Sequence, residues 1–273
     1  MSKLNQRVVA ITGAGSGIGR ALAVESAKRG ADLALSDVNE AGLKETAAQC
    51  EKAGAKVHTQ IVNVAERDAV EAWCDAIVKH FGKVHVIINN AGVALNADVA
   101  HTEYEDFEWL MGINFWGVVY GTKTFLPQIR KNDWGHIVNI SSLFGLLGIP
   151  NQSAYNAAKF AVRGFTESLQ CEMRVSGENI GVSCVHPGGI KTNIANAARF
   201  SHSTSTRSQD ADQLKKEFNE KLARTTPEQA ANIILKGIEN NQERVLVGMD
   251  AVALDRMQRM MPTGYRKLVA KFA

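Results

Sequence analysis

The sequence contains little cysteine and proline, and it has none of the close cysteine pairs that bind metals. Four cysteines and five prolines occur in 273 residues. No C-x-x-C pair is present, and the seven histidines are dispersed without tight spacing to a cysteine. This pattern argues against a zinc site and favours reduced, mostly buried thiols. We therefore expect no metal; the scattered cysteines are Cys50, Cys74, Cys171 and Cys184.

The chain also lacks a long apolar run and a strong charge imbalance. No run is long enough to span a bilayer, and the N-terminus leads into a short strand-like segment rather than a signal peptide. A cytoplasmic location is the expectation. The formal net charge of +3 is too small to indicate nucleic-acid binding. The extension 249–273 is basic and amphipathic, as in segments that contact membrane surfaces, but docking against its own domain is favoured.

Buried strand-like segments alternate with helical segments along most of the chain. This alternation predicts a parallel sheet with helices on both faces, because parallel strands need crossover connections. We predict one α/β domain over residues 1–273, doubly wound and Rossmann-type, with about seven strands. Strands are predicted at 7–12, 31–37, 56–64, 84–90, 135–142, 180–188 and 244–248, and helices within 17–30, 40–53, 66–81, 104–131, 152–176 and 226–240.

The segment 193–226 interrupts this alternation. Residues 201–212 within it are polar and poor in hydrophobic side chains. Long polar loops of this kind are typically mobile, and some of them cover binding sites. We predict a mobile substrate loop here, with a plain surface loop as the alternative.

A glycine-rich turn follows the first predicted strand and opens the first predicted helix. It reads TGAGSGIG over residues 12–19. Glycine lets the chain approach a pyrophosphate, and the helix N-terminus supplies free N–H groups and the positive end of a dipole. The turn lacks G-K-[ST], which argues against a P-loop nucleotidase, and its spacing differs from G-x-G-x-x-G. Gly13, Ser16, Gly17, Ile18 and Gly19 are the candidate contacts.

An acidic residue, Asp37, ends the second predicted strand. A carboxylate there accepts hydrogen bonds from an adenosine ribose 2′-OH and repels a 2′-phosphate. Val38 follows it, and no arginine or lysine interrupts the glycine turn before Gly19. The sequence therefore favours NAD over NADP. A second role for Asp37, as a helix N-cap, is compatible with this one.

Further polar residues stand at predicted strand ends and inside two helices. NNAG (89–92) and NISS (139–142) end two strands, and Asn114 lies within an apolar stretch. Tyr155 and Lys159 share one face of an alanine-rich helix, since they are four residues apart. In isolation, solvent exposure would explain such a pair.

Taken in order, these motifs resemble the short-chain dehydrogenase/reductase family in its short form. The matching elements are T-G-x-x-x-G-x-G (12–19), N-N-A-G (89–92), Asn114, Ser142, Y-x-x-x-K (155–159) and P-G-G-I-K-T (187–192). They cover residues 7 to about 250. One departure is Asn63, where the family commonly has an aspartate that contacts the adenine amino group. An amide oxygen can still accept that hydrogen bond.

The resemblance implies a hydride-transfer enzyme with a defined set of site residues. Tyr155 is implied as the general acid/base, with its pKa lowered by Lys159, which also binds the nicotinamide ribose. Ser142 is implied to position the substrate oxygen, and Asn114 to hold a water that links Lys159 to solvent. The implied cofactor contacts are Gly13, Ser16, Gly17, Ile18, Gly19, Asp37, Asn63, Val64, Asn90, Ala91, Gly92, Tyr155, Lys159, Pro187, Gly188, Ile190 and Thr192. A homodimer or homotetramer formed through 104–131 and 152–176 is also implied.

The segments expected near the nicotinamide are strongly apolar, and no basic cluster accompanies them. They predict a hydrophobic secondary alcohol or ketone that is steroid-, retinoid- or lipid-like. An equally weighted alternative makes several of these residues core or subunit contacts. The candidate substrate-pocket residues are Leu95, Ser142, Phe144 and Tyr155, within an apolar set of Val93, Leu95, Leu143, Phe144, Leu146, Leu147 and Ile149.

Three other functions compete with this hypothesis. The first is an NADPH-dependent carbonyl reductase of the same family. The second is a catalytically idle dinucleotide-binding scaffold, which has no need of the complete Asn114, Ser142, Tyr155 and Lys159 set. The third is a methyltransferase, which shares the glycine turn and the acidic strand end but does not need the serine, tyrosine and lysine.

Overall fold

The computed structural model describes residues 2–192, 194, 197–200 and 224–272. Most of the predicted mobile loop, 193–226, lies outside the described residues. The remaining chain forms a seven-stranded sheet in the order β3-β2-β1-β4-β6-β7-β9. Every pairing in it is parallel. The predicted doubly wound, Rossmann-type α/β fold is thus confirmed.

The strands follow the predicted order but several are shorter than expected. They are β1 (Val8–Thr12), β2 (Asp32–Asp37), β3 (Val57–Ile61), β4 (Val86–Asn89), β6 (Gly135–Ile140), β7 (Ile180–Pro187) and β9 (Arg244–Val247). The predicted ranges for β3, β4 and β6 extended too far at their C-terminal ends, into residues that leave the sheet at its carboxyl edge. Those polar residues, among them Asn63, Asn90 and Ser142, lie in the loops that follow the strands.

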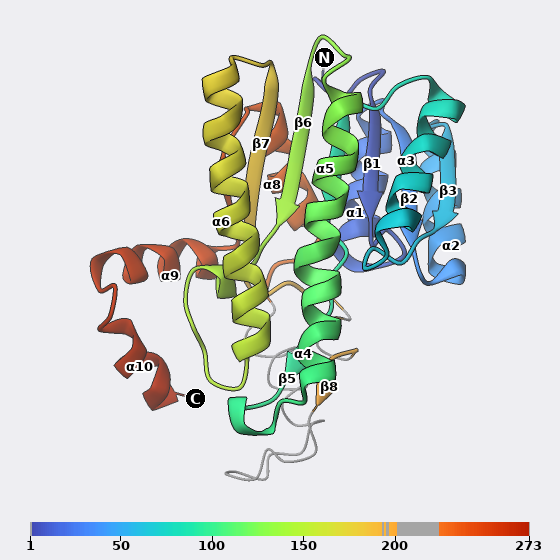
Figure 1. Ribbon diagram of the computed structural model, residues 1–273. Helices are drawn as coiled ribbons and strands as arrows, with labels where there is room; N and C mark the ends of the chain where they lie inside the picture. Colours follow the sequence, from blue (N-terminus) through green and yellow to red (C-terminus); the bar gives the residue numbers. More distant parts are fainter. Residues whose placement is uncertain (1, 193, 195–196, 201–223, 273) are drawn as a thin grey trace.

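Helices cover both faces of the sheet (Figure 1), and the sheet separates two apolar cores. On one face, Leu22, Leu43 and Ile234 pack against the sheet in one buried cluster. On the other face, Trp73, Phe125 and Leu169 belong to a second cluster. The first face carries α1 (Gly17–Lys28), α2 (Glu40–Lys52) and α8 (Pro227–Glu239); the second carries α3 (Arg67–Phe81), α5 (Gly117–Ile129) and α6 (Ser153–Ser176).

The predicted helix at 104–131 is two helices joined by a π-helical segment. α4 (Tyr104–Met111) leads into the π segment Gly112–Trp116, which continues as α5. The amide of Gly117 donates to the carbonyl of Gly112, five residues earlier, instead of the carbonyl four residues back. Single π turns of this kind often mark functional sites. Asn114 lies in the middle of it.

The sequence did not predict a small second sheet. β5 (Leu95–Asn96) and β8 (Arg199–Phe200) pair in parallel beyond the carboxyl edge of the main sheet. The guanidinium of Arg199 lies 3.6 Å from the centroid of the Trp109 ring and forms an ion pair with Asp106 at 2.7 Å. Strands of two residues give no periodic signal, so these contacts depend on tertiary structure.

The C-terminal extension forms two helices that reach out from the sheet edge (Figure 1). They are α9 (Met249–Met260) and α10 (Tyr265–Phe272). Asp255 of α9 forms an ion pair with Arg244 of β9, and Tyr265 of α10 packs with Leu143 and Leu146. The extension therefore contacts its own domain through these residues, as favoured from the sequence.

Candidate active site

The carboxyl ends of the parallel strands bring the predicted site residues to one edge of the sheet. Thr12 ends β1, Asp37 ends β2, Asn89 ends β4 and Ile140 ends β6. The segments that follow these strands carry the glycine turn, NNAG and NISS. Ligands of doubly wound sheets bind at this edge.

The glycine turn is shaped by contacts that leave no room for a β-carbon. A Cβ on Gly13 would lie 2.8 Å from the Cα of Ala91, and one on Gly19 would overlap the carbonyl of Gly13. Gly13 and Gly17 also have positive φ angles of 65° and 53°, which favour glycine. Ser16 is the exposed N-cap of α1, and its side chain makes no capping hydrogen bond. The turn thus presents the N-terminus of α1 as a site for an anionic group.

Asp37 lies directly against the glycine turn. Its carboxylate accepts hydrogen bonds at 2.8 Å from the amide of Gly15 and at 2.8 Å from the amide of Asn39. The nearby Arg20 donates to the carbonyl of Gly15 and forms an ion pair with Glu45 at 2.7 Å. The arginine closest to this turn in sequence is therefore already committed to protein partners.

NNAG is tied to the glycine turn through one threonine and one amide. The hydroxyl of Thr12 accepts hydrogen bonds from the amides of Asn90 and Ala91 at 2.9 and 3.0 Å. The side-chain amide of Asn90 donates to the carbonyls of Thr12 and Gly13. Thr12 was not among the predicted site residues, although its position at the end of β1 was a signal for it.

Asn63, the departure from the family pattern, lies in an exposed loop after β3. Its side chain donates to Glu66 at 2.9 Å and accepts from the amide of Ala65 at 3.2 Å. Val64, beside it, is buried against Gly117 of α5. These two predicted contacts therefore lie at the same sheet edge, but the Asn63 side chain is bonded to its own loop.

The segment after β7, Pro187 to Thr192, approaches the glycine turn from the other side. A Cβ on Gly17 would meet the side chain of Thr192 at 3.2 Å. Asp250, in the first turn of α9, accepts a hydrogen bond from the amide of Gly189 at 2.7 Å. Gly188 lies so close to the Asp250 carboxylate that a β-carbon would overlap it. Sequence reasoning missed Asp250, because an acidic residue early in a helix usually indicates only a favourable dipole contact.

Ser142 and Tyr155 come together between β6 and α6. The Ser142 hydroxyl oxygen accepts a hydrogen bond from the amide of Phe144 at 3.1 Å, which fixes the side chain. Burial raises the pKa of the Tyr155 phenol, and a hydrogen bond with Ser142 partly offsets this. The ring of Phe144 meets the Tyr155 ring edge-on, with centroids 6.1 Å apart.

Lys159 is almost fully buried, with 3% of its surface exposed. Its Nζ atom donates to the carbonyl of Ile140 at 3.0 Å and lies 5.6 Å from the centroid of the Tyr155 ring. Burial lowers the pKa of Lys159 to about 8. In this arrangement burial is the largest influence on the Tyr155 pKa, and the Lys159 ammonium is bonded to the main chain. The expectation that Lys159 lowers the Tyr155 pKa stays a prediction.

Asn114 is fully buried and clamps the chain that follows NNAG. Its side-chain oxygen accepts from the amide of Val93 and its side-chain nitrogen donates to the carbonyl of Val93, both at 2.8 Å. A Cβ on Gly92 would lie 3.3 Å from the Asn114 oxygen and 3.6 Å from the Lys159 Nζ. Asn114, Gly92 and Lys159 are therefore neighbours, and both ends of the amide are used by Val93.

The apolar residues around the site divide into buried and partly exposed groups. Leu95 packs in a cluster with Leu110 and Ala158, and a second buried group packs against Tyr265 of α10. Asn156, which was not predicted, holds this second group by bonding to the main chain of Phe144, Leu147 and Ile149. The buried members are Leu95, Leu143, Leu146 and Leu147, and the partly exposed members are Val93, Phe144 and Ile149.

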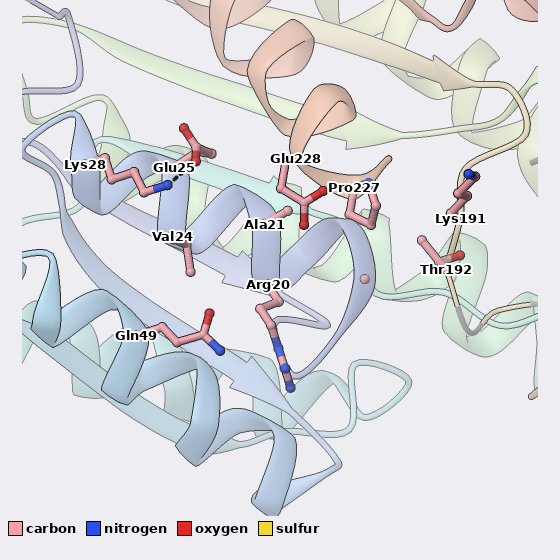
Figure 2. A pocket seen from close by; sticks show the side chains of 11 residues that line it. Arg20, Ala21, Val24, Glu25, Lys28, Gln49, Lys191, Thr192, Pro227 and Glu228 are labelled. Carbon is pink, nitrogen blue, oxygen red and sulfur yellow. Dashed lines mark hydrogen bonds and ion pairs between the residues drawn. The ribbon is translucent and has the colours of Figure 1, made fainter. Parts of the chain in front are cut away.

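A groove of about 740 Å³ opens beside this edge, between α1, α2 and the N-terminus of α8 (Figure 2). It meets the predicted cofactor contacts only at Gly17 and Thr192. Its charged side chains have both signs, and Lys28 is paired with Glu25 at 2.7 Å. The groove does not include Ser142, Tyr155 or Lys159. Its described lining is Gly17, Arg20, Ala21, Val24, Glu25, Lys28, Gln49, Lys191, Thr192, Pro227 and Glu228.

In the described part of the chain, no three His, Cys, Asp or Glu side chains gather closely enough to hold a metal ion. None of the helices within 2–192 and 224–272 combines the length and apolar character needed to cross a membrane.

Comparison with known proteins gives consistent matches over nearly the whole chain. The model of the short chain dehydrogenase family matches residues 7–202. The chain is 50% identical over 270 residues to the Mycobacterium tuberculosis protein named as an oxidoreductase, SadH, covering 99% of this chain and 96% of that protein. It is 32% identical over 273 residues to human estradiol 17-beta-dehydrogenase 11, covering 97% and 84%.

A solved structure gives a similar result. A short chain dehydrogenase/reductase from Burkholderia phymatum, in complex with NAD, superimposes with a TM-score of 0.86 at 32% identity. The match covers 96% of this chain and 95% of that one.

Proposed function

Because the chain belongs to the short-chain dehydrogenase/reductase family, we propose that it interconverts hydrophobic secondary alcohols and ketones with NAD as its cofactor. Membership makes it an NAD(P)-dependent oxidoreductase. The observation that carries the proposal is the grouping of Ser142, Tyr155 and Lys159 at the sheet edge that also holds the glycine turn.

The residues at this edge fit a dinucleotide. The glycine turn packs so closely on Ala91, Asp37 and Thr192 that only glycine leaves space there. The N-terminus of α1 would hold the pyrophosphate, and Asp37 would accept the ribose hydroxyls. Lys159 would hold the nicotinamide ribose, and Pro187 to Thr192 would hold the carboxamide. When bound, the cofactor accepts or supplies the hydride.

The chain's own residues would transfer the proton and bind the substrate oxygen. Ser142 would donate its hydroxyl hydrogen to that oxygen while its own oxygen accepts from the Phe144 amide. Tyr155 would release or take up the proton; its raised pKa keeps it protonated at neutral pH, which suits ketone reduction. Lys159 and the buried Asn114 would form the path for proton exchange. A water held near Asn114 stays a prediction.

Asp37 and its surroundings support NAD over NADP. The carboxylate is held in place by the amides of Gly15 and Asn39. Arg20 makes hydrogen bonds to Gly15 and Thr46 and pairs with Glu45, so it is not available for a 2′-phosphate. Val38, the next residue along the chain, is exposed and uncharged. A site of this kind would disfavour the extra phosphate electrostatically.

A hydrophobic substrate is supported by two observations. Val93 and Phe144 remain partly exposed beside Tyr155, so they offer an apolar wall. A relative at 32% identity is named for its action on estradiol. Leu95 supports this less than expected, because it is buried in a cluster of its own.

Association into dimers or tetramers is part of the proposal. Trp116 and Phe160 are 47% and 40% exposed on the π segment and α6, the elements expected at subunit contacts. Light scattering of the purified protein tests this. A cytoplasmic location stays a prediction.

The function is tested with a panel of secondary alcohols and ketones offered with NAD(H) and with NADP(H). We expect turnover of apolar cyclic or long-chain members with NAD. Clear preference for NADPH would favour a carbonyl reductase, and turnover confined to small polar sugars would contradict the hydrophobic substrate. Cofactor binding without any turnover would favour a dinucleotide-binding scaffold.

A further inference from the structure

His186 lies where the backbone pairing of β6 and β7 ends. The last rung of this pairing joins Ile140 to Val185, and the amide of Ser141 donates to the carbonyl of Val185 at 2.8 Å. Beyond this point the two chains separate. The ring of His186 adds one more hydrogen bond between these two segments, because its Nδ1 atom lies 3.0 Å from the carbonyl oxygen of Ser142.

The bond has a defined direction. A carbonyl oxygen only accepts, so Nδ1 carries the hydrogen and donates it. The other ring nitrogen, Nε2, is buried without a hydrogen-bond partner among residues 2–192 and 224–272. His186 is fully buried, and burial lowers its pKa to about 4, so the ring is neutral at neutral pH. A neutral ring with the hydrogen on Nδ1 donates a hydrogen bond to the carbonyl oxygen of Ser142.

This bond fixes Ser142 relative to the rest of the sheet. The Ser142 carbonyl also accepts from the amide of Gly145, but that bond lies within the local turn. Within the part of the chain that the structure describes, only the His186 bond connects this carbonyl to β7 and to Pro187, where the segment proposed to hold the carboxamide begins. One side chain thus joins the serine to the neighbouring wall of the site.

We propose that His186 is a positioning residue, which sets the distance between Ser142 and the carboxamide-binding segment by donating from Nδ1 to the Ser142 carbonyl. It acts on the substrate oxygen only through Ser142. This inference rests on the proposed function, since it presumes that Ser142 contacts the substrate.

The test compares His186→Leu with His186→Asn. Leucine removes the donor and places an apolar side chain in the core. Asparagine places an amide N–H at the position of Nδ1, but it is smaller and polar. A purely structural role predicts that leucine is the better replacement, whereas a positioning role predicts that asparagine is better for turnover.

We expect kcat of His186→Leu to fall about 10- to 100-fold, because small misplacements of a positioned group cost rates of this size. KM and NADH affinity, measured by fluorescence titration, should change little. His186→Asn should recover most of the lost kcat, even if it unfolds at a lower temperature. Unchanged kcat in His186→Leu, or an asparagine variant no faster than the leucine variant, would overturn the inference.

His136 provides a matched control between the same two strands. It is also fully buried, bonds to Ser183 at 2.8 Å through Nε2, and has an Nδ1 without a partner in the described chain. His136→Leu should lower stability and leave kcat unchanged.

If His186→Leu does not fold, His186→Gln replaces it, because the amide of glutamine lies one bond farther from the backbone than Nδ1 of histidine. The asparagine variant should then be faster than the glutamine variant, and equal rates would overturn the inference. Tyr155→Phe, measured in parallel, distinguishes failure of the proposed function from failure of the His186 inference. Full activity of Tyr155→Phe would contradict the proposed function, whereas the His186 variants test only the positioning role.

Discussion

The carboxylate of Asp37 accepts a hydrogen bond from the amide of Gly15 across 2.8 Å, so the acidic end of β2 and the glycine turn form one structural unit. A β-carbon on Gly15 would lie 2.9 Å from that carboxylate. This contact orients the carboxylate at the edge where the proposed ribose would lie. Cofactor choice should therefore depend on Asp37 more than on any other acidic residue of β2.

Asp37→Ser should weaken NADH binding about 10- to 100-fold, since a hydrogen bond to a charged group contributes about 1.5–3 kcal/mol. NADPH binding should improve as the negative charge is removed. Asp32→Ser is the control, because Asp32 begins the same strand and bonds to the amide of Lys56 at the opposite end. Fluorescence titration measures both. Equal losses in the two variants would contradict the role of Asp37.

Lys159 should make stability depend on alkaline pH. Its pKa is lowered from 10.5 to about 8 in the folded protein, so between these values the unfolded chain binds more protons and unfolding becomes less favourable as the pH rises. The stability contributed by the lowered Lys159 pKa is complete above the pKa of lysine in the unfolded chain, and it is lost as the pH falls through about 8. Relative to Lys159→Met, the free energy of unfolding of the wild type should rise by about 2–3 kcal/mol from about pH 7 to about pH 10. Urea titrations of both proteins measure this, and a constant difference would be evidence against it.

Two buried histidines away from the site should make the protein sensitive to acid. Burial lowers the pKa of His85 to about 4 and that of His136 to about 3. The stability they contribute is present above their ordinary pKa near 6.5 and is lost as the pH falls toward the lowered values. His136→Leu should reduce the slope of unfolding free energy by about 1.4 kcal/mol per pH unit between about pH 4 and pH 6. An unchanged slope would mean that His136 does not titrate on unfolding.

The C-terminal extension should stabilise the wall of the site through Tyr265. Its hydroxyl accepts from the amide of Gly148 at 3.0 Å, and its ring packs with Leu143 and Leu146. Tyr265→Phe keeps the ring and removes the hydroxyl, so it should lower stability by about 1 kcal/mol. The exposed Tyr104 is the control, and Tyr104→Phe should leave the melting temperature unchanged. Equal melting temperatures for all three proteins would show that the Gly148 bond contributes nothing.

Much of this architecture was predictable because strands and helices have different periods. Buried runs such as Val8–Thr12 predict strands directly, and the sequence Thr226, Pro227 and Gln229 has the spacing of a capping box that begins α8. The π turn at Asn114 was not predictable, since its residues are compatible with a regular helix and only the tertiary contact with Val93 explains the buried amide.

The site was predictable in its residue types but not in its internal contacts. The order of the glycine turn, Ser142, Tyr155 and Lys159 predicted a site, and the structure places these residues at one edge of the sheet. The contacts of Asp250 with Gly189 and of His186 with Ser142 join segments far apart in the chain. The raised Tyr155 pKa likewise depends on burial, which the spacing of tyrosine and lysine does not reveal.

The central claim, that Tyr155 exchanges the proton with the substrate, is tested most directly by turnover of Tyr155→Phe. The variant keeps the ring that packs against Phe144 and loses only the hydroxyl. Thermal unfolding and NADH titration should match the wild type, and kcat on the best substrate of the panel should fall about 10²- to 10⁴-fold. A folded Tyr155→Phe variant that binds NADH and turns over at the wild-type rate would contradict the account.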